Sequence, residues 1–165
     1  MKKSRYNILL YDIGSHTGLY GGQLARIHLF NGLNLDSFNP LLLTSNKKAL
    51  YHEAIMYGIK VIVDKSIYRL DKRVSRSNFS FYSLIRYMNN LVLSTTALLK
   101  IIKKNKIDIV FPNDNYSRVV VCFSKLFVKI KIATYISDDF KGSLVERILI
   151  FIIFSFSDLI FVPSH

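Results

Sequence analysis

A glycine-rich turn after the first predicted strand is the part of this chain best suited to hold a ligand. The strand is Asn7–Tyr11, and it is followed by four of the seven glycines of the chain, Gly14, Gly18, Gly21 and Gly22. Glycines between a buried strand and a helix let the backbone approach a ligand closely and direct free N–H groups at an anion. The turn therefore predicts a phosphate or diphosphate site, although a tight turn without a ligand would use the same glycines. The spacing fits neither GxGxxG nor GxxxxGK(S/T), so the dinucleotide and P-loop patterns are not indicated.

Polar side chains also follow several later strands of the predicted sheet. They are Asn113 and Asp114 after Ile107–Phe111, Ser137 and Asp138 after Lys131–Ile136, and Ser164 after Leu159–Val162. Because the carboxyl ends of parallel strands lie on one edge of a sheet, these residues and the glycine turn should form one wall of a ligand cleft. Asn113 and Asp114 also precede a predicted helix, as do Asp138 and Asp139, so helix capping is an alternative role for these residues.

Short apolar runs alternate with helical patterns along the whole chain, and this alternation predicts an α/β fold. We expect about six strands and five helices, with most strands continuously apolar, as in a parallel sheet that is covered on both faces. Right-handed crossovers then give a doubly wound sheet. Residues 33–40 are predicted to turn the chain into the strand Leu41–Thr44, and Gly58 is predicted to end the following helix.

The longest predicted helix runs from about Ser80 to Lys104. Apolar residues recur in it every three or four positions, which is the spacing of a stripe that faces a core. The residues of this predicted stripe are Leu84, Met88, Leu91, Leu98 and Ile102.

Length and composition predict a single domain, residues 1–165. Half of the residues are hydrophobic, which excludes a disordered chain. The one cysteine, Cys122, lies in an apolar run and is predicted to be buried rather than paired in a disulfide or bound to a metal. The apolar segment Ile148–Ser157 is about half the length of a membrane-spanning helix, and no signal peptide is recognisable. We therefore expect a cytoplasmic protein.

The chain carries a net charge of +12, and part of it is concentrated in one predicted loop. The basic residues of this loop are Lys65, Arg69, Lys72, Arg73 and Arg76. A patch of this kind attracts phosphates, so the loop predicts peripheral contact with an anionic membrane surface. A second cluster, Lys100–Lys106, ends the long helix, where lysines also favour the helix dipole. Compositional bias is the alternative explanation for the charge, and a nucleic-acid partner is not expected because few aromatic residues accompany the bases.

Neither a metal nor an organic cofactor is predicted. No group of His, Cys and carboxylate residues has the spacing of metal ligands. His16 lies in the glycine turn and has no partner nearby in the sequence, so it is interpreted as a loop residue.

Four segments of the chain, taken in order, resemble the amino-terminal domain of the GT-B glycosyltransferases, of the family 4 type. They are Gly21–Gly22 at the start of the first helix, IDIVFPN at Ile107–Asn113, ATYISDD at Ala133–Asp139 and SDLIFVPS at Ser157–Ser164. The resemblance extends over essentially all 165 residues. It implies a Rossmann-like domain that supplies the acceptor side of a cleft, while a carboxyl-terminal donor domain is absent from this sequence.

The resemblance also implies roles for individual residues. Gly21 and Gly22 would face the donor diphosphate, Ser137 and Asp138 would lie near the reacting sugar, and Ser164 would lie at the cleft edge. The chain departs from the family pattern at three positions. Gln23 stands where Glu is frequent, and Asn113 and Ser137 stand where the family has His, with Asn113 kept as a substrate-binding residue. The change at Ser137 puts the usual geometry around the transferred sugar in doubt.

The sequence thus predicts half of a glycosyltransferase. It would transfer a sugar from a nucleotide-sugar donor to a glycan or lipid-linked acceptor at the inner membrane face. Alone it would be inactive, and a separate donor-domain chain would be its partner if the enzyme is split. The alternative is a non-catalytic module that binds anionic lipid or glycan and recruits a catalytic subunit.

Overall fold

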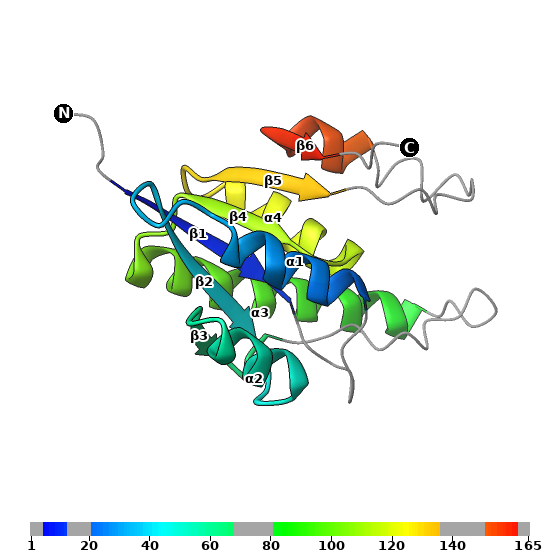
Figure 1. Cartoon of the computed structure of the whole chain (residues 1–165). Helices are drawn as coiled ribbons and strands as arrows, with labels where there is room; N and C mark the ends of the chain where they lie inside the picture. Colours follow the sequence, from blue (N-terminus) through cyan, green and yellow to red (C-terminus); the bar gives the residue numbers. More distant parts are fainter. Residues whose placement is uncertain (1–4, 13–20, 68–80, 136–150, 162–165) are drawn as a thin grey trace.

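The computed structural model describes residues 5–12, 21–67, 81–135 and 151–161. Within them, six strands form one sheet in the order β3-β2-β1-β4-β5-β6, and every neighbouring pair is parallel (Figure 1). The predicted doubly wound α/β fold is therefore confirmed. The strands are β1 (Tyr6–Tyr11), β2 (Phe38–Thr44), β3 (Lys60–Val63), β4 (Ile109–Pro112), β5 (Lys131–Tyr135) and β6 (Leu159–Phe161). The helices are α1 (Gly21–Asn31), α2 (Ala49–Met56), α3 (Phe81–Asn105) and α4 (Asn115–Lys125), and residues 151–156 are also helical.

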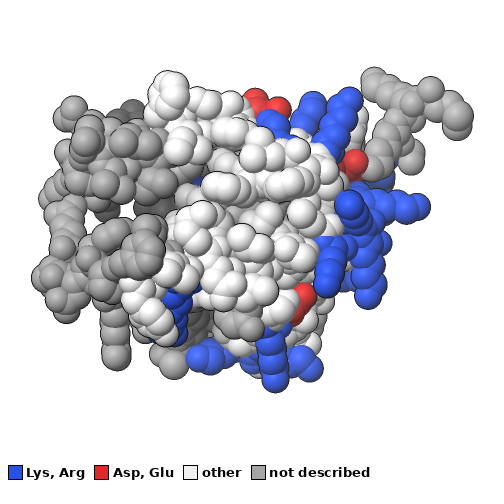
Figure 2. Space-filling model, turned by 180° about the vertical axis from the view of Figure 1, so that it is seen from behind, with Lys and Arg blue, Asp and Glu red and all other residues white. Residues whose placement is uncertain are grey.

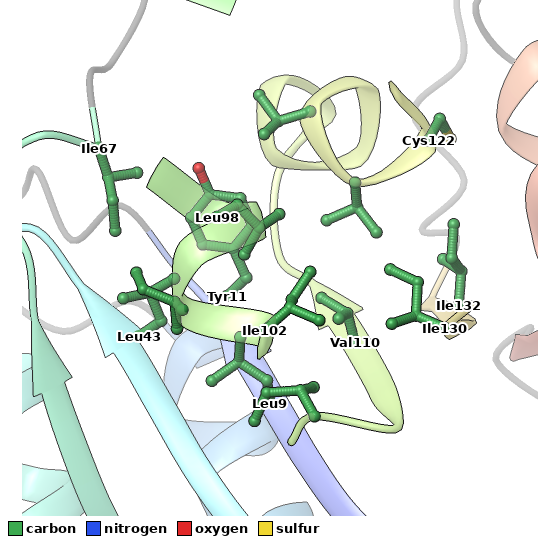
Figure 3. Packing of buried hydrophobic residues seen from close by; sticks show 14 of the residues in the cluster. Leu9, Tyr11, Leu43, Ile67, Leu98, Ile102, Val110, Cys122, Ile130 and Ile132 are labelled. Carbon is green, nitrogen blue, oxygen red and sulfur yellow. The ribbon is translucent and has the colours of Figure 1, made fainter. Parts of the chain in front are cut away.

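Helices cover both faces of the sheet: α1 and α2 lie on one face, and α3 and α4 on the other (Figure 1). The alternation of side chains along β1 decides which face each residue joins. Leu9 and Tyr11 belong to the cluster under α3 and α4, part of which is drawn in Figure 3. Ile8 and Leu10 belong to the cluster under α1 and α2. The next residue with the parity of Leu10 is Asp12, which therefore points to the α1 face.

The start of β2 corrects the sequence prediction, because residues 38–40 form strand instead of turn. Pro40 is opposite Ile8 of β1, but the pairing of β2 with β3 begins only at Leu41, opposite Lys60. No β3 residue is paired with Pro40, so this side of Pro40 is an open edge. Proline has no N–H to donate, and no ladder hydrogen bond is required from it there. The helix end at Gly58 is as predicted, with φ of +70°, a backbone conformation that suits glycine.

The predicted stripe on α3 is only partly correct. Leu91, Leu98 and Ile102 are buried, but Met88 is 46% exposed; the side chain of Leu84 lies outside the described residues. The reason is length. A helix of 25 residues is about 37 Å long, whereas a strand of 4 to 7 residues spans about 13–23 Å, so the first turns of α3 extend beyond the sheet (Figure 1). An apolar spacing there has no sheet to cover.

One carboxylate reinforces the ladder that joins the last described strand, β6, to β5. Asp158 Oδ2 accepts hydrogen bonds from the Ile132 amide at 2.8 Å and from Lys125 Nζ at 2.5 Å, and Lys125 also donates to the Phe156 carbonyl. Burial alone would raise the pKa of Asp158, but these hydrogen bonds and the lysine charges outweigh it and lower that pKa. The contacts tie α4, β5 and β6 together.

One further prediction concerns a single residue. Cys122 is buried as predicted, and burial raises the pKa of its thiol to about 11. None of the helices that the structure describes is long and apolar enough to cross a membrane.

Candidate functional site

The direction of strand order changes between β1 and β4, and this is where an open α/β sheet binds its ligand. Tyr11 is opposite Pro112 in the ladder, so the next residues, Asp12 and Asn113, are neighbours at the carboxyl edge. The Asn113 amide donates to the Tyr11 carbonyl at 3.0 Å, which continues the ladder to this point. Each strand beside the switch point thus ends in a polar side chain on the α1 face.

Asp12 joins two amide side chains into one cluster. Its Oδ2 accepts a hydrogen bond from Gln23 Nε2 at 3.1 Å and another from Asn113 Nδ2. Asp12 and Gln23 are both buried, at 4% and 7% exposed, while Asn113 is half-buried. A buried carboxylate needs such donors, because an unpaired one would be strongly disfavoured. The bonds fix the Asn113 amide at the carboxyl edge of the sheet, with its NH₂ turned toward Asp12.

The described part of α1 starts beside this cluster, because Gln23 of its first turn contacts Asp12. The helix begins at Gly21 and has no acidic residue in its first turn, so no carboxylate of that turn competes for its backbone N–H groups. A β-carbon on Gly21 would meet no heavy atom within 4 Å, whereas one on Gly22 would lie 3.3 Å from Nη1 of Arg26. The surroundings of Gly21 therefore leave space beside the backbone.

Two arginines approach the end of β5 from opposite faces of the sheet. From α1, Arg26 donates to the Gly22 carbonyl at 2.8 Å, and its guanidinium carbon lies 5.9 Å from the Tyr135 ring centroid. From α4, the buried Arg118 donates to the Tyr135 carbonyl. Burial lowers the pKa of both guanidinium groups, and for Arg118 the charge of Arg26 lowers it further. The carboxyl edge thus carries positive charge close to the start of α1.

Asp114 is a helix cap. Its Oδ1 accepts from the Ser117 amide at 2.9 Å, and its own amide donates to Ser117 Oγ at 3.0 Å. Burial raises the pKa of Asp114, although the hydrogen bond from Ser117 opposes the shift. The sequence left two roles open for Asn113 and Asp114, ligand binding and helix capping. In the structure Asp114 caps α4, while the Asn113 side chain faces Asp12.

Some predicted site residues are described and others are not. Gly21, Gly22 and Asn113 lie together at the carboxyl edge, and Lys65 is exposed beyond the end of β3. The remaining predicted residues lie outside the described residues; they are Ser137, Asp138, Ser164, Arg69, Lys72, Arg73 and Arg76. Among the residues that the structure describes, no three His, Cys, Asp or Glu side chains are grouped so that they could hold a metal ion.

Sequence reasoning missed Asp12, Arg26, Arg118 and Tyr135. Asp12 had a usable signal, because it ends the first strand directly before the glycine turn. The others gave no local signal, since their proximity depends on how α1 and α4 pack around the end of β5.

Solved structures with a similar fold are known, although no protein-family model and no curated protein matches the sequence. The structure of HepE from Anabaena in complex with UDP-glucose matches with a TM-score of 0.64 and 13% identity over 93% of this chain. MurG from Acinetobacter baumannii matches with a TM-score of 0.63 and 11% identity over 97% of the chain. A UDP-N-acetylglucosamine 2-epimerase matches with a TM-score of 0.62 and 14% identity over 99% of it.

These likenesses confirm that the chain has the fold of a GT-B-like amino-terminal domain, as its resemblance implied. The more specific assignment to family 4 stays a prediction. The chain spans 36% of the length of HepE, 43% of MurG and 42% of the epimerase, so it is similar to a part of each of these proteins.

Proposed function

We propose that this chain is the acceptor-side half of a glycosyltransferase that uses a nucleotide-sugar donor and acts on a glycan or lipid-linked acceptor. The observation that carries the proposal is the Asp12–Gln23–Asn113 cluster, which lies at the topological switch point beside the start of α1. A helix start of this kind attracts a phosphate, and amide side chains suit sugar hydroxyl groups. The fold, which is that of UDP-sugar proteins such as HepE, supports the same function.

In this proposal the donor diphosphate lies against the first turn of α1. Gly21 and Gly22 permit its close approach, and Arg26 adds a positive charge one turn further along. Backbone N–H groups and a fixed guanidinium would stabilise the charge that develops on the leaving diphosphate, which is commonly the largest catalytic contribution. Ser137, Asp138 and Ser164 are proposed at the acceptor side only from the family resemblance.

A second α/β domain would supply the rest of the donor site. We expect the isolated chain to bind UDP-glucose weakly and to transfer no sugar, because one wall of a cleft does not enclose a donor. Robust transfer by the purified chain without a partner would contradict the half-enzyme interpretation, even if donor binding is confirmed.

The direct test is a titration of the isotopically labelled chain with UDP-glucose, followed by amide NMR shifts. We expect the largest shifts at Gly21, Gly22 and Gln23, and a weaker affinity for the variant Arg26→Gln. The matched control is Arg86→Gln, which removes an exposed arginine of α3 on the other face of the sheet. Shifts confined to other parts of the chain, or equal weakening by both variants, would refute the proposed donor site.

A further inference from the structure

The edge of the sheet opposite the candidate site is strongly basic. Arg5 precedes β1, Lys60 begins β3, Lys106 lies shortly before β4 and Lys131 begins β5. In a parallel sheet all of these positions lie at the same edge, because every strand starts there. Figure 2 shows most of the blue Lys and Arg side chains gathered along one end of the molecule.

Five exposed lysines form the centre of this basic edge, and we call them the amino-edge lysines: Lys103, Lys104, Lys106, Lys129 and Lys131. The first three lie at the end of α3, where the helix dipole also favours a positive charge. That explanation does not extend to Lys129 and Lys131, which lie at the entry to β5.

The backbone at Lys106 is left-handed where the chain leaves α3. Lys106 has φ of +52°, a left-handed conformation that favours glycine at the end of a helix. The amide of the next residue, Ile107, donates to the Ile102 carbonyl at 3.0 Å and so closes the end of α3 around it. A lysine here is conformationally less favourable than glycine, so the turn by itself does not explain this residue.

Two large apolar side chains protrude beside the amino-edge lysines. Leu126 and Phe127 follow α4 and are 61% and 67% exposed. They lie in the short segment between Lys125 and Lys129, so lysines flank them on both sides. Exposed apolar residues surrounded by lysines are the combination that binds an anionic lipid interface, where the apolar groups enter the headgroup region and the bases contact phosphates.

A neighbouring groove is less suited to anions. It has a volume of about 680 Å³ and is lined by Lys125, Lys129 and Lys131, but also by Asp108 and Asp158. Lys125 is already paired with Asp158 at 2.5 Å. Asp158 thus offsets Lys125, whereas Lys129 and Lys131 are exposed, so the charge that these two lysines offer to an anion is on the outer surface, where Leu126 and Phe127 are also exposed.

We propose that the amino-edge lysines, with Leu126 and Phe127, dock this chain on an anionic lipid bilayer. This surface differs from the loop Lys65–Arg76, for which the sequence predicted membrane contact. Docking by the amino edge turns the candidate site away from the bilayer, at a distance of at least one strand length, or about 15–20 Å. An acceptor would then have to extend that far from the membrane to reach the site.

The test is sedimentation of the whole chain with vesicles of phosphatidylglycerol and phosphatidylcholine, compared with phosphatidylcholine alone. Changing all five amino-edge lysines to Gln should lower the partition coefficient on anionic vesicles by more than about tenfold. The matched control changes the same number of charges, those of Lys65, Arg69, Lys72, Arg73 and Arg76, to Gln, and it should bind nearly as well as the parent chain.

A second variant, Leu126→Ser with Phe127→Ser, tests insertion without changing the charge. It should also bind less, and circular dichroism should show an unchanged fold because both side chains are exposed. The proposal is overturned if the loop variant loses binding while the amino-edge variant keeps it, or if all variants bind like the parent. It is equally overturned if the parent chain does not bind anionic vesicles and its amino-edge lysines bind single-stranded RNA instead.

Discussion

Replacing Asp12 should destabilise the domain and disorder the candidate site together. The carboxylate is 4% exposed and accepts hydrogen bonds from the side chains of Gln23 and Asn113. The variant Asp12→Ala removes the shared acceptor and leaves the buried Gln23 amide without this partner. The variant Asp12→Asn keeps the shape and one acceptor oxygen but removes the charge. The two variants therefore separate the contribution of the hydrogen bonds from that of the charge.

The size of the effect follows from the two bonds. A hydrogen bond to a charged group contributes about 1.5–3 kcal/mol, and a buried polar group that loses its partner costs about 1–3 kcal/mol. Because the bonds share one oxygen, their contributions do not add fully. We expect Asp12→Ala to lower the free energy of unfolding by about 3 kcal/mol and Asp12→Asn by about 1–2 kcal/mol.

The assay is urea unfolding at pH 7, followed by far-ultraviolet circular dichroism. The matched control is Asp36→Asn, an exposed carboxylate in the turn after α1, which should change the free energy of unfolding by less than about 0.5 kcal/mol. In NMR spectra of Asp12→Asn, the side-chain NH₂ signals of Gln23 and Asn113 should move, and in Asp36→Asn they should not.

The reasoning would be refuted by a particular pattern of results. If Asp12→Ala is as stable as Asp36→Asn, and the NH₂ signals of Gln23 and Asn113 stay in place, Asp12 does not organise this cluster. If the stability falls but the NH₂ signals do not move, Asp12 supports the fold by other contacts, and the arrangement of the site is not explained by it.

Four further variants test buried groups and the start of α1. The Tyr11 hydroxyl is fully buried with no hydrogen-bond partner among the described residues, so Tyr11→Phe should leave the free energy of unfolding unchanged or raise it by up to about 1 kcal/mol. Tyr116→Phe loses the hydrogen bond to the Asn90 carbonyl at 3.1 Å and should lower the free energy of unfolding by about 1 kcal/mol in the same urea assay. Equal losses of stability in the two tyrosine variants would contradict this difference between a bonded and an unbonded hydroxyl. Burial raises the pKa of Asp114 above that of the unfolded chain, so the parent loses stability as the pH rises through these two pKa values. Asn can still cap α4, so Asp114→Asn should be more stable than the parent at pH 7 but not below about pH 4. A stability difference between variant and parent that does not change with pH would refute the assignment. Gly21→Ala has space for its β-carbon and should fold normally in a thermal melt, yet bind UDP-glucose more weakly in a titration, and an unchanged affinity would show that the diphosphate does not approach there.

The sequence by itself determined the kind of fold and one end of the candidate site. Continuous apolar runs such as that of β1 predicted buried parallel strands, because a strand covered on both faces needs apolar side chains on both sides. Gly21, Gly22 and Asn113 were found because local patterns place them after strands. The basic edge could have been found in the same way, since Lys106 and Lys131 lie at strand starts in the sequence.

Only the tertiary structure decided which of these residues meet. The register of β1 with β4 brings Asp12 to Asn113 across 101 positions of sequence, and no local periodicity contains that pairing. The exposure of Met88 could not be predicted from the sequence either, because the spacing of a helical stripe does not say where the sheet under the helix ends. Hydrophobic pattern fixes which face of an element is buried, whereas strand order and register, which are properties of the assembled sheet, fix the neighbours of each polar group.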